Sequence, residues 1–213
     1  MPRLAAALSL ALVGLALFGR PQAASAAACT LPRIAGAEQT LPDPAALDKH
    51  RLDLAILARV NYARCQAGLA ALAPAPPLAA VAIAQSRWMA AQRQLTHYGG
   101  PPGLESLRAR LAATGLPFTA GAENIATAGL YRLDNREVRL GPGACRFFDL
   151  SGRPIGRQSY DSLAEEVVAA WLASPGHRRN ILDARLRAAG AGAGFDRSGP
   201  FCGTFYLTQD FLG

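Results

Sequence analysis

Residues 171–182 read Trp-Leu-Ala-Ser-Pro-Gly-His-Arg-Arg-Asn-Ile-Leu, and this stretch organises the rest of the chain. Upstream of it, Ser162-Leu-Ala-Glu165 has the spacing of a capping box and predicts the start of a helix that runs into the stretch. Ser174-Pro-Gly breaks that helix, so we expect the residues after it to form a turn or a single helical turn. His177 therefore lies at an irregular, glycine-flanked position, where its imidazole can face a cleft.

On either side of this stretch, the sequence predicts helices early in the chain and strands late. Helical periodicity, prolines and glycines place helices at about residues 45–67, 77–97 and 104–111, and strands within about 118–128, 188–195 and 201–211. Glycines alternate at positions 190, 192 and 194, which would let a strand lie close beneath a helix. This order of elements predicts an α+β domain in which helices sandwich the strands.

Composition excludes several classes of protein. The chain has 213 residues, of which 51% are hydrophobic and 17% charged, and this suits one globular domain rather than a disordered chain. The formal net charge is +7, but the arginines are scattered and no DNA- or RNA-binding motif is visible. Lys49 is the only lysine. We therefore expect no nucleic-acid partner.

The first 28 residues have the pattern of a secretory signal peptide. Arg3 precedes an apolar run over residues 4–18, and small residues at 23–28 supply sites for cleavage. The run is shorter than the ~20 residues that a membrane span needs. An uncleaved anchor, or a lipoprotein modified at Cys29, stays an alternative. No transmembrane segment is expected in the mature chain, which should be secreted or periplasmic.

Four cysteines in an exported chain predict two disulfides. They are Cys29, Cys65, Cys145 and Cys202. Three pairings are possible; we expect Cys29–Cys65 and Cys145–Cys202, which would pin the N-terminal tail and a loop to the main body. The tail is an extended, proline-containing lead-in over residues 29–49. The loop belongs to an irregular segment at about 127–160, which we expect to form one or two hairpins inserted at the surface.

Two histidines and two glutamates are the best candidates for a functional site. His97 and His177 both lie beside glycines or helix breaks, and neutral imidazole is a common ligand of transition metals. Glu123 lies in an otherwise apolar, small-residue stretch, and Glu166 is near the start of the fourth predicted helix. Glu165 is already assigned to the capping box. On residue types alone, solvated or locally hydrogen-bonded side chains explain these residues more simply than a shared site does.

The order of several short motifs along the chain favours a shared site over independent side chains. They are Asn61-Tyr-Ala-Arg64 with Gly68-Leu-Ala-Ala-Leu72, Glu123-Asn-Ile-Ala126, residues 171–182, Gly190-Ala-Gly192 and Tyr206-Leu-Thr-Gln-Asp-Phe211. Together they resemble the CAP superfamily of cysteine-rich secretory, antigen 5 and pathogenesis-related proteins, in particular its bacterial secreted members. The resemblance covers residues 50–213 and implies a three-layer α-β-α sandwich of the CAP (SCP) type.

The resemblance also implies a shallow cleft that holds two histidines and two glutamates. By motif these are His97, His177, Glu123 and Glu166, the last because it stands five residues before Trp171, as the family's helix acid does. In some relatives the histidines bind a divalent metal such as zinc, with the glutamates beside them. Carboxylates in such a place can orient the imidazoles through their second nitrogen.

This sequence departs from the family pattern in two places. Ala122 stands where the family usually has glycine directly before Glu123, so we expect its methyl group to narrow the approach to that carboxylate. The segment at 127–160 is also longer than in compact bacterial relatives and contains Cys145. We expect this insertion to cover or extend the cleft.

Three functions are compatible with these residues. We favour a secreted, non-catalytic module that binds a ligand such as a lipid or cell-envelope component, with a divalent metal such as zinc held by His97 and His177. The alternative is a metal-dependent hydrolase or peptidase in which the metal activates water and Glu123 or Glu166 is the general base. A third interpretation gives the four side chains a purely structural role. No nucleophile lies next to a base, which is why we favour binding over catalysis.

Overall fold

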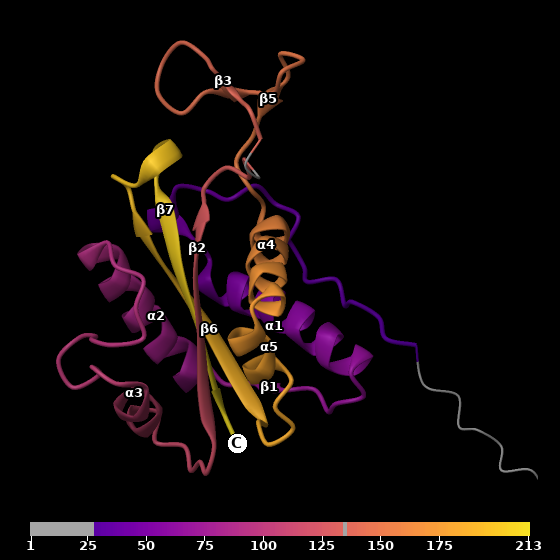
Figure 1. Cartoon of the computed structure of the whole chain (residues 1–213), viewed down its shortest axis with the longest axis vertical. Helices are drawn as coiled ribbons and strands as arrows, with labels where there is room; N and C mark the ends of the chain where they lie inside the picture. The colour runs from indigo at the N-terminus through magenta and orange to yellow at the C-terminus, as the bar shows by residue number, and fades with distance from the viewer. Residues whose placement is uncertain (1–27, 134–135) are drawn as a thin grey trace, which may run out of the picture.

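A four-stranded sheet lies at the centre of the molecule (Figure 1). The computed structural model describes residues 28–133 and 136–213, so the predicted signal peptide lies outside the described residues apart from Ala28. The strands are β1 (Ala73–Pro74), β2 (Gly121–Gly129), β6 (Ala188–Asp196) and β7 (Thr204–Leu212), in the order β1-β6-β7-β2. The three long strands are antiparallel, whereas β1 runs parallel to β6. The sequence predicted the three long strands and missed β1.

Helices cover both faces of this sheet (Figure 1). They are α2 (Pro76–Gln92) and α3 (Leu107–Ala113) on one face, and α1 (Lys49–Gln66), α4 (Tyr160–Ala173) and α5 (Pro175–Ile181) on the other. Buried side chains of α1 and α4, such as Ile56 and Trp171, pack with Phe211 of the sheet in the larger core. Leu78 and Leu111 from α2 and α3 form a smaller core on the opposite face. The predicted α-β-α sandwich is confirmed.

Three glycines bring α2 directly onto the sheet. A Cβ atom on Gly190, Gly192 or Gly194 would lie 2.2 Å from a backbone atom of α2. Real Cβ atoms do not approach backbone this closely, so the helix can lie at this depth only over residues without side chains. The predicted close approach of strand and helix at these glycines is confirmed.

Two helix ends differ from the sequence-based expectation. The capping box that begins α4 is formed by Ser159 and Ser162, each side chain accepting from the other's backbone N–H at 3.0 Å. The predicted box of Ser162 with Glu165 is therefore wrong, and Glu165 instead pairs with Arg132. The second difference is at the end of α2. This helix ends at Gln92 because Arg93 adopts a left-handed conformation (φ 55°), so His97 lies in the following loop and not at the helix end.

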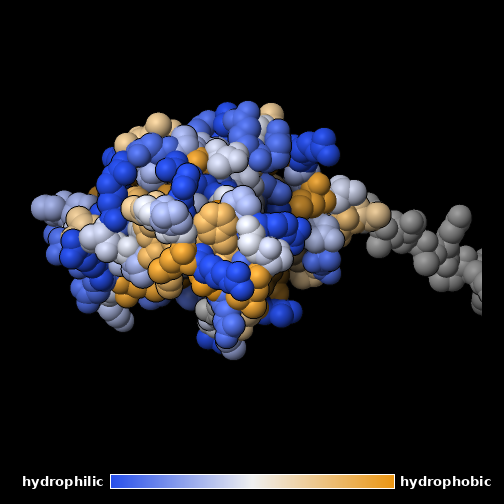
Figure 2. Space-filling view, turned by 90° about the horizontal axis from the view of Figure 1, so that it is seen from above, coloured by the Kyte–Doolittle hydropathy of each residue, from blue (hydrophilic) through white to orange (hydrophobic). Residues whose placement is uncertain are grey.

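The segment after β2 forms a small sheet of its own. Its strands are β3 (Arg139–Leu140), β4 (Phe147–Phe148) and β5 (Pro154–Ile155), in two antiparallel pairs. It projects beyond one end of the sandwich, as the predicted hairpins would (Figure 1). Figure 2 looks down on that end and shows hydrophobic and hydrophilic residues interspersed. Across residues 28–133 and 136–213, no helix has both the length and the apolar character needed to cross a membrane.

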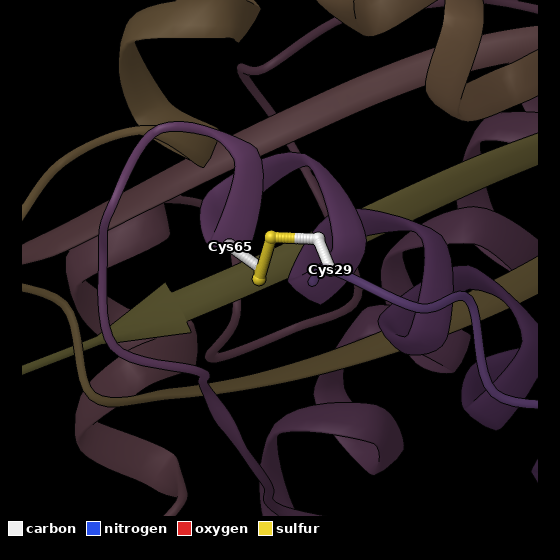
Figure 3. Close-up of a disulfide and its surroundings, with 2 residues drawn as sticks. All are labelled: Cys29 and Cys65. Atoms are coloured by element: carbon white, nitrogen blue, oxygen red, sulfur yellow. A yellow bond between two sulfur atoms is a disulfide. The ribbon is translucent and has the colours of Figure 1, made fainter. Parts of the chain in front are cut away.

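Two disulfides fasten the less regular parts of the chain. Cys29 is bonded to Cys65 in the last turn of α1, which anchors the lead-in (Figure 3). Cys145 is bonded to Cys202 and joins the small sheet to η2 (Pro200–Cys202), the turn between β6 and β7. This is the pairing that we expected. A short helix, η1 (Pro44–Ala46), interrupts the otherwise extended lead-in.

A buried carboxylate links α1 to the sheet and makes stability depend on pH. Asp53 accepts a hydrogen bond from the Ala191 N–H at 2.7 Å, and burial raises its pKa to about 6. The folded protein therefore binds more protons than the unfolded chain between about pH 4 and 6, so the free energy of unfolding should fall as pH rises through that window.

The substitution Asp53→Asn should flatten this pH dependence, because the amide keeps an oxygen acceptor but does not ionise. Urea unfolding across that window measures the effect. The control is Asp149→Asn, which should leave the pH dependence of unfolding unchanged. Hydrogen bonds, of which the one from Ser151 has the largest effect, lower the pKa of Asp149 to about 2, and this is outside the window. An unchanged slope in Asp53→Asn would contradict the assignment.

Candidate functional site

Glu123 and His97 form the centre of the candidate site. Glu123 is on β2 and only 2% of its side chain is exposed, whereas His97, in the loop after α2, is 45% exposed. His97 Nδ1 lies 2.7 Å from Glu123 Oε1. A proton on Nδ1 makes this bond, which leaves Nε2 as the nitrogen that can accept a ligand. The buried carboxylate therefore fixes both the orientation and the tautomer of a half-exposed imidazole.

The second oxygen of Glu123 is also engaged. Arg110 of α3, which is fully buried, donates from Nη2 to Glu123 Oε2 at 2.5 Å and from Nη1 to the Leu104 carbonyl at 3.1 Å. Both Glu123 oxygens are thus held, one by a cation and one by His97. A carboxylate bound in this way orients its neighbours, and it is poorly placed to accept a proton as a general base.

Two asparagines bring His177 to this place. Asn124 of β2 donates to the His177 carbonyl at 3.2 Å, and Asn180 of α5 donates to the Glu123 carbonyl at 3.0 Å and to Asn124 Oδ1 at 2.9 Å. Trp171 adds a bond from its indole nitrogen to the Ile125 carbonyl at 3.0 Å. These contacts hold α4 and α5 against the outer edge of β2. Asn180 thus joins α5 to the sheet.

The two imidazoles face each other across this edge. The ring centroids of His97 and His177 lie 6.2 Å apart, with the planes tilted by 51°. Burial, together with the charge of His97, lowers the pKa of His177. His177 is therefore neutral at neutral pH, which is the form of imidazole that binds a metal.

A third acidic residue, Asp210, lies behind Glu123. It is on β7 directly opposite Glu123, and no donor among the described residues reaches either of its buried carboxyl oxygens. Burial, and then the charge of Glu123, raises the pKa of Asp210 well above its usual range. The raised pKa favours the protonated form of Asp210, which can donate its proton to the facing Glu123, so that a single negative charge is shared with Arg110.

The methyl group of Ala122 does not narrow the approach to Glu123. Successive side chains of a strand point to opposite faces. Glu123 faces α2 and α3, whereas Ala122 packs with the larger core beneath α1 and α4. The expected obstruction is therefore wrong.

Glu166 is not brought to this site. Its Oε2 accepts from Gln158 Nε2 at 2.7 Å, and Gln158 Nε2 also donates to the Gly129 carbonyl at 3.0 Å. Gly129 is six residues along β2 from Glu123, about 20 Å at the usual rise of a strand. Glu166 lines a separate cavity of about 540 Å³ at the insertion end, so the predicted group of four is corrected to His97, Glu123 and His177.

The described residues offer a metal two protein ligands here. Within residues 28–133 and 136–213, no three or more His, Cys, Asp or Glu side chains are grouped so as to hold a metal ion. His97 and His177 remain as a pair with Glu123 behind them. Two imidazole ligands leave several coordination positions open, so a metal held there would bind weakly and would accept a further ligand.

Sequence reasoning missed Arg110 and Asp210, although each carries a detectable signal. Arg110 follows Leu107 by three residues on a short helix, so it borders the face that Leu107 and Leu111 bury. Asp210 is next to the core residue Phe211 on a strand that is buried on both faces. A charge in each of these positions predicts a buried partner of opposite sign.

Solved structures of similar fold include an extracellular protein and an outer surface protein. An extracellular protein with an SCP domain from Bacillus anthracis has a TM-score of 0.53 and 26% identity, over 80% of this chain and 43% of that one. The CAP domain of enterococcal PrgA has a TM-score of 0.47 and 15% identity, over 83% and 67%. An outer surface protein of Borrelia burgdorferi has a TM-score of 0.46 and 15% identity, over 74% and 90%. The chain spans less than half of the B. anthracis protein.

The sequence itself gives the family. No curated protein sequence matches the chain. Residues 57–211, which include all three side chains of the site, match the profile of the cysteine-rich secretory protein family. The match extends over most of the chain and agrees with the sandwich of helices and sheet described above. The chain belongs to the cysteine-rich secretory protein (CAP) family.

Proposed function

We propose that this chain is a secreted or periplasmic binding module in which His97 and His177 hold a divalent metal ion such as zinc. The observation that carries the proposal is the 2.7 Å contact between His97 Nδ1 and the buried Glu123 carboxylate. Metal-binding histidines are commonly oriented by a carboxylate on their other ring nitrogen. Here that carboxylate is itself held by the buried Arg110, and the half-exposed His97 keeps Nε2 for a ligand.

The donor set fits such an ion. Neutral imidazole nitrogen is a common ligand of zinc, and the rings of His97 and His177, with centroids 6.2 Å apart, are the groups that would hold the ion. When bound, the metal would supply a positive centre for an oxygen or nitrogen of the ligand. His97 and His177 hold it, and Glu123 fixes the tautomer of His97.

Binding is favoured over hydrolysis because the acidic residues are not placed for proton transfer. Both oxygens of Glu123 are engaged, and Glu166 lies near Gly129 at the far end of β2. A metal-dependent hydrolase needs a base beside the metal-bound water. We infer that the ligand is a lipid or cell-envelope component with a polar group that can approach the two imidazoles.

Calorimetric titration of Zn²⁺ into the oxidised protein tests the metal site. Saturable binding is expected for the wild type and should be lost in the His97→Ala/His177→Ala double variant. The matched control is His50→Ala, which removes the exposed third histidine, on α1, and should leave binding intact. Because the pKa of His177 is lowered, proton competition at that ring should begin at a lower pH than for an ordinary histidine. A folded wild type that binds no Zn²⁺, or equal loss in His50→Ala, would overturn the proposal.

A further inference from the structure

The outer edge of β6, far from the histidines, presents backbone donors to a cavity. β1 pairs with Ala188 and Ala189, and in the part of the chain that the structure describes no strand pairs with the rest of β6 on that side. At Ala191 the N–H that points away from β7 donates to the chain's own carboxylate, Asp53 of α1, at 2.7 Å. The edge thus already binds one anionic group, supplied from within the molecule.

The next donors along the same edge have no such partner. Alternate residues of an antiparallel strand direct their N–H groups away from the neighbouring strand. Since the Ala191 N–H points to the open edge, those of Ala193 and Phe195 do so too. No side chain within the described part of the sequence accepts a hydrogen bond from either. Both residues line a cavity of about 250 Å³.

Three cations from three different segments line the same cavity. They are Lys49 at the start of α1, Arg87 of α2 and Arg197 after β6, and the lining contains no carboxylate. Arg197 is held by Asp43 at 2.5 Å, just outside the lining. Within residues 28–133 and 136–213, Lys49 and Arg87 have neither a hydrogen bond nor an ion pair through their side chains.

The positions of Lys49 and Arg87 on α1 and α2 bring them close to the outer edge of β6. Lys49 precedes Asp53 by one helical turn, so the face of α1 that offers a carboxylate to Ala191 offers an ammonium group further along. Arg87 comes from the stretch of α2 that lies over Gly194, where a Cβ would be 2.6 Å from the Arg87 Cα. Along this edge, the N–H of Ala191 therefore binds a carboxylate of the chain itself, whereas the N–H groups of Ala193 and Phe195 lie near positively charged side chains.

We infer that this cavity binds the phosphoryl group of an anionic ligand. Open sheet edges can form anion-binding concavities, and charge-assisted bonds from Lys and Arg to phosphate oxygens are among the strong ones. A phosphoryl group carries several acceptor oxygens, which matches two backbone N–H groups together with the side chains of Lys49 and Arg87. A phosphate ester in solution and a phospholipid headgroup both present this chemistry.

Because Lys49 is the only lysine, amine acylation reports on this cavity alone once peptide mapping separates it from the N-terminal amine. Inorganic phosphate at saturating concentration should slow the acylation of Lys49 several-fold, and sodium chloride at the same ionic strength should slow it much less. Equal rates in phosphate and in chloride would overturn the inference.

Two variants and a control separate this site from general positive charge. Lys49→Gln and Arg87→Gln should each weaken calorimetric phosphate binding about tenfold or more, since each removes a charge-assisted hydrogen bond. Arg108→Gln removes an exposed arginine from α3, which packs at the opposite edge of the sheet, and should have no effect. Thermal melting confirms that the variants are folded. Equal losses in all three variants, or no phosphate binding by the wild type, would overturn the site.

Vesicles distinguish the source of the phosphoryl group. Binding to phosphatidylglycerol vesicles that is lost in Lys49→Gln and Arg87→Gln, but kept in Arg108→Gln, would assign a lipid headgroup. Phosphate binding without vesicle binding would assign a soluble phosphate ester, and either result supports the cavity as the site. The histidines lie at the other edge of the sheet, so these outcomes do not depend on the proposed metal.

Discussion

Replacing Arg64 with leucine is expected to lower the free energy of unfolding by about 4 kcal/mol or more. The Arg64 side chain is almost fully buried, and its guanidinium donates only to backbone carbonyls. Those acceptors belong to Ala70, Ile181, Asp183 and, at a long 3.5 Å, Leu186. Leucine fills part of the space and supplies no donor, so the buried carbonyls of Ile181 and Leu186 lose their partner.

The loss should be large because the single side chain of Arg64 joins two loops. One follows α1, and the other follows α5, the helix that carries His177. Urea unfolding followed by circular dichroism measures the effect. Arg64→Lys should recover a minority of it, since an ammonium group cannot reproduce the planar fork of donors.

Arg185→Leu is the matched control for Arg64→Leu. Arg185 is exposed and pairs with Asp183 at the surface. Its removal should cost less than about 1 kcal/mol, as is usual for exposed ion pairs. If Arg64→Leu stayed within the range of this control, the buried guanidinium would not be a main support of the fold.

Gly192→Ala is expected to destabilise the protein by about 3 kcal/mol or more, at or above the usual upper limit for overpacking. The added Cβ would lie 2.2 Å from the Ile83 nitrogen and 2.5 Å from the Ala82 carbonyl carbon, both backbone atoms of α2. A side chain could rotate away, but a backbone inside a helix cannot. The helix must therefore lift from the sheet and lose buried contacts on either side.

Gly156→Ala provides the comparison for this second variant. Gly156 has no atom within 4 Å of the position that a Cβ would take. The substitution should change the free energy of unfolding by no more than about 0.5 kcal/mol. Equal melting temperatures for Gly192→Ala and Gly156→Ala would show that α2 does not lie as close to β6 as described.

The sequence was sufficient for the main elements because their patterns are local. Periodicity and breaks located the main helices and the long strands within a few residues, and the glycines of β6 predicted a close helix. The capping box was assigned one turn too late because Ser159 and Ser162 are equally good candidates, and local spacing does not choose between them. In the structure, α4 begins after Ser159, and Ser159 forms a β-bridge with Thr40, a contact between segments distant in the sequence.

The site was predicted in part for the same reason. His97, Glu123 and His177 lie where β2 and its flanking loops meet, which the order of motifs anticipates. The placement of Glu166 in the site was wrong. Its spacing from Trp171 defines only a face of α4, whereas the position of α4 along β2 decides which end of the strand Glu166 reaches. That register depends on packing, which no spacing within a single helix contains.

The contacts that position His177 also close the outer edge of β2. Asn180 and Trp171 take up the Glu123 and Ile125 carbonyls, which a strand from a second molecule would otherwise use. Uncovered sheet edges are templates for intermolecular strand pairing and aggregation. The polar contacts around the site therefore protect against self-association as well as hold a histidine in place. The side chains that hold the candidate site together thus also cover an edge of the sheet that would otherwise be open to a second molecule.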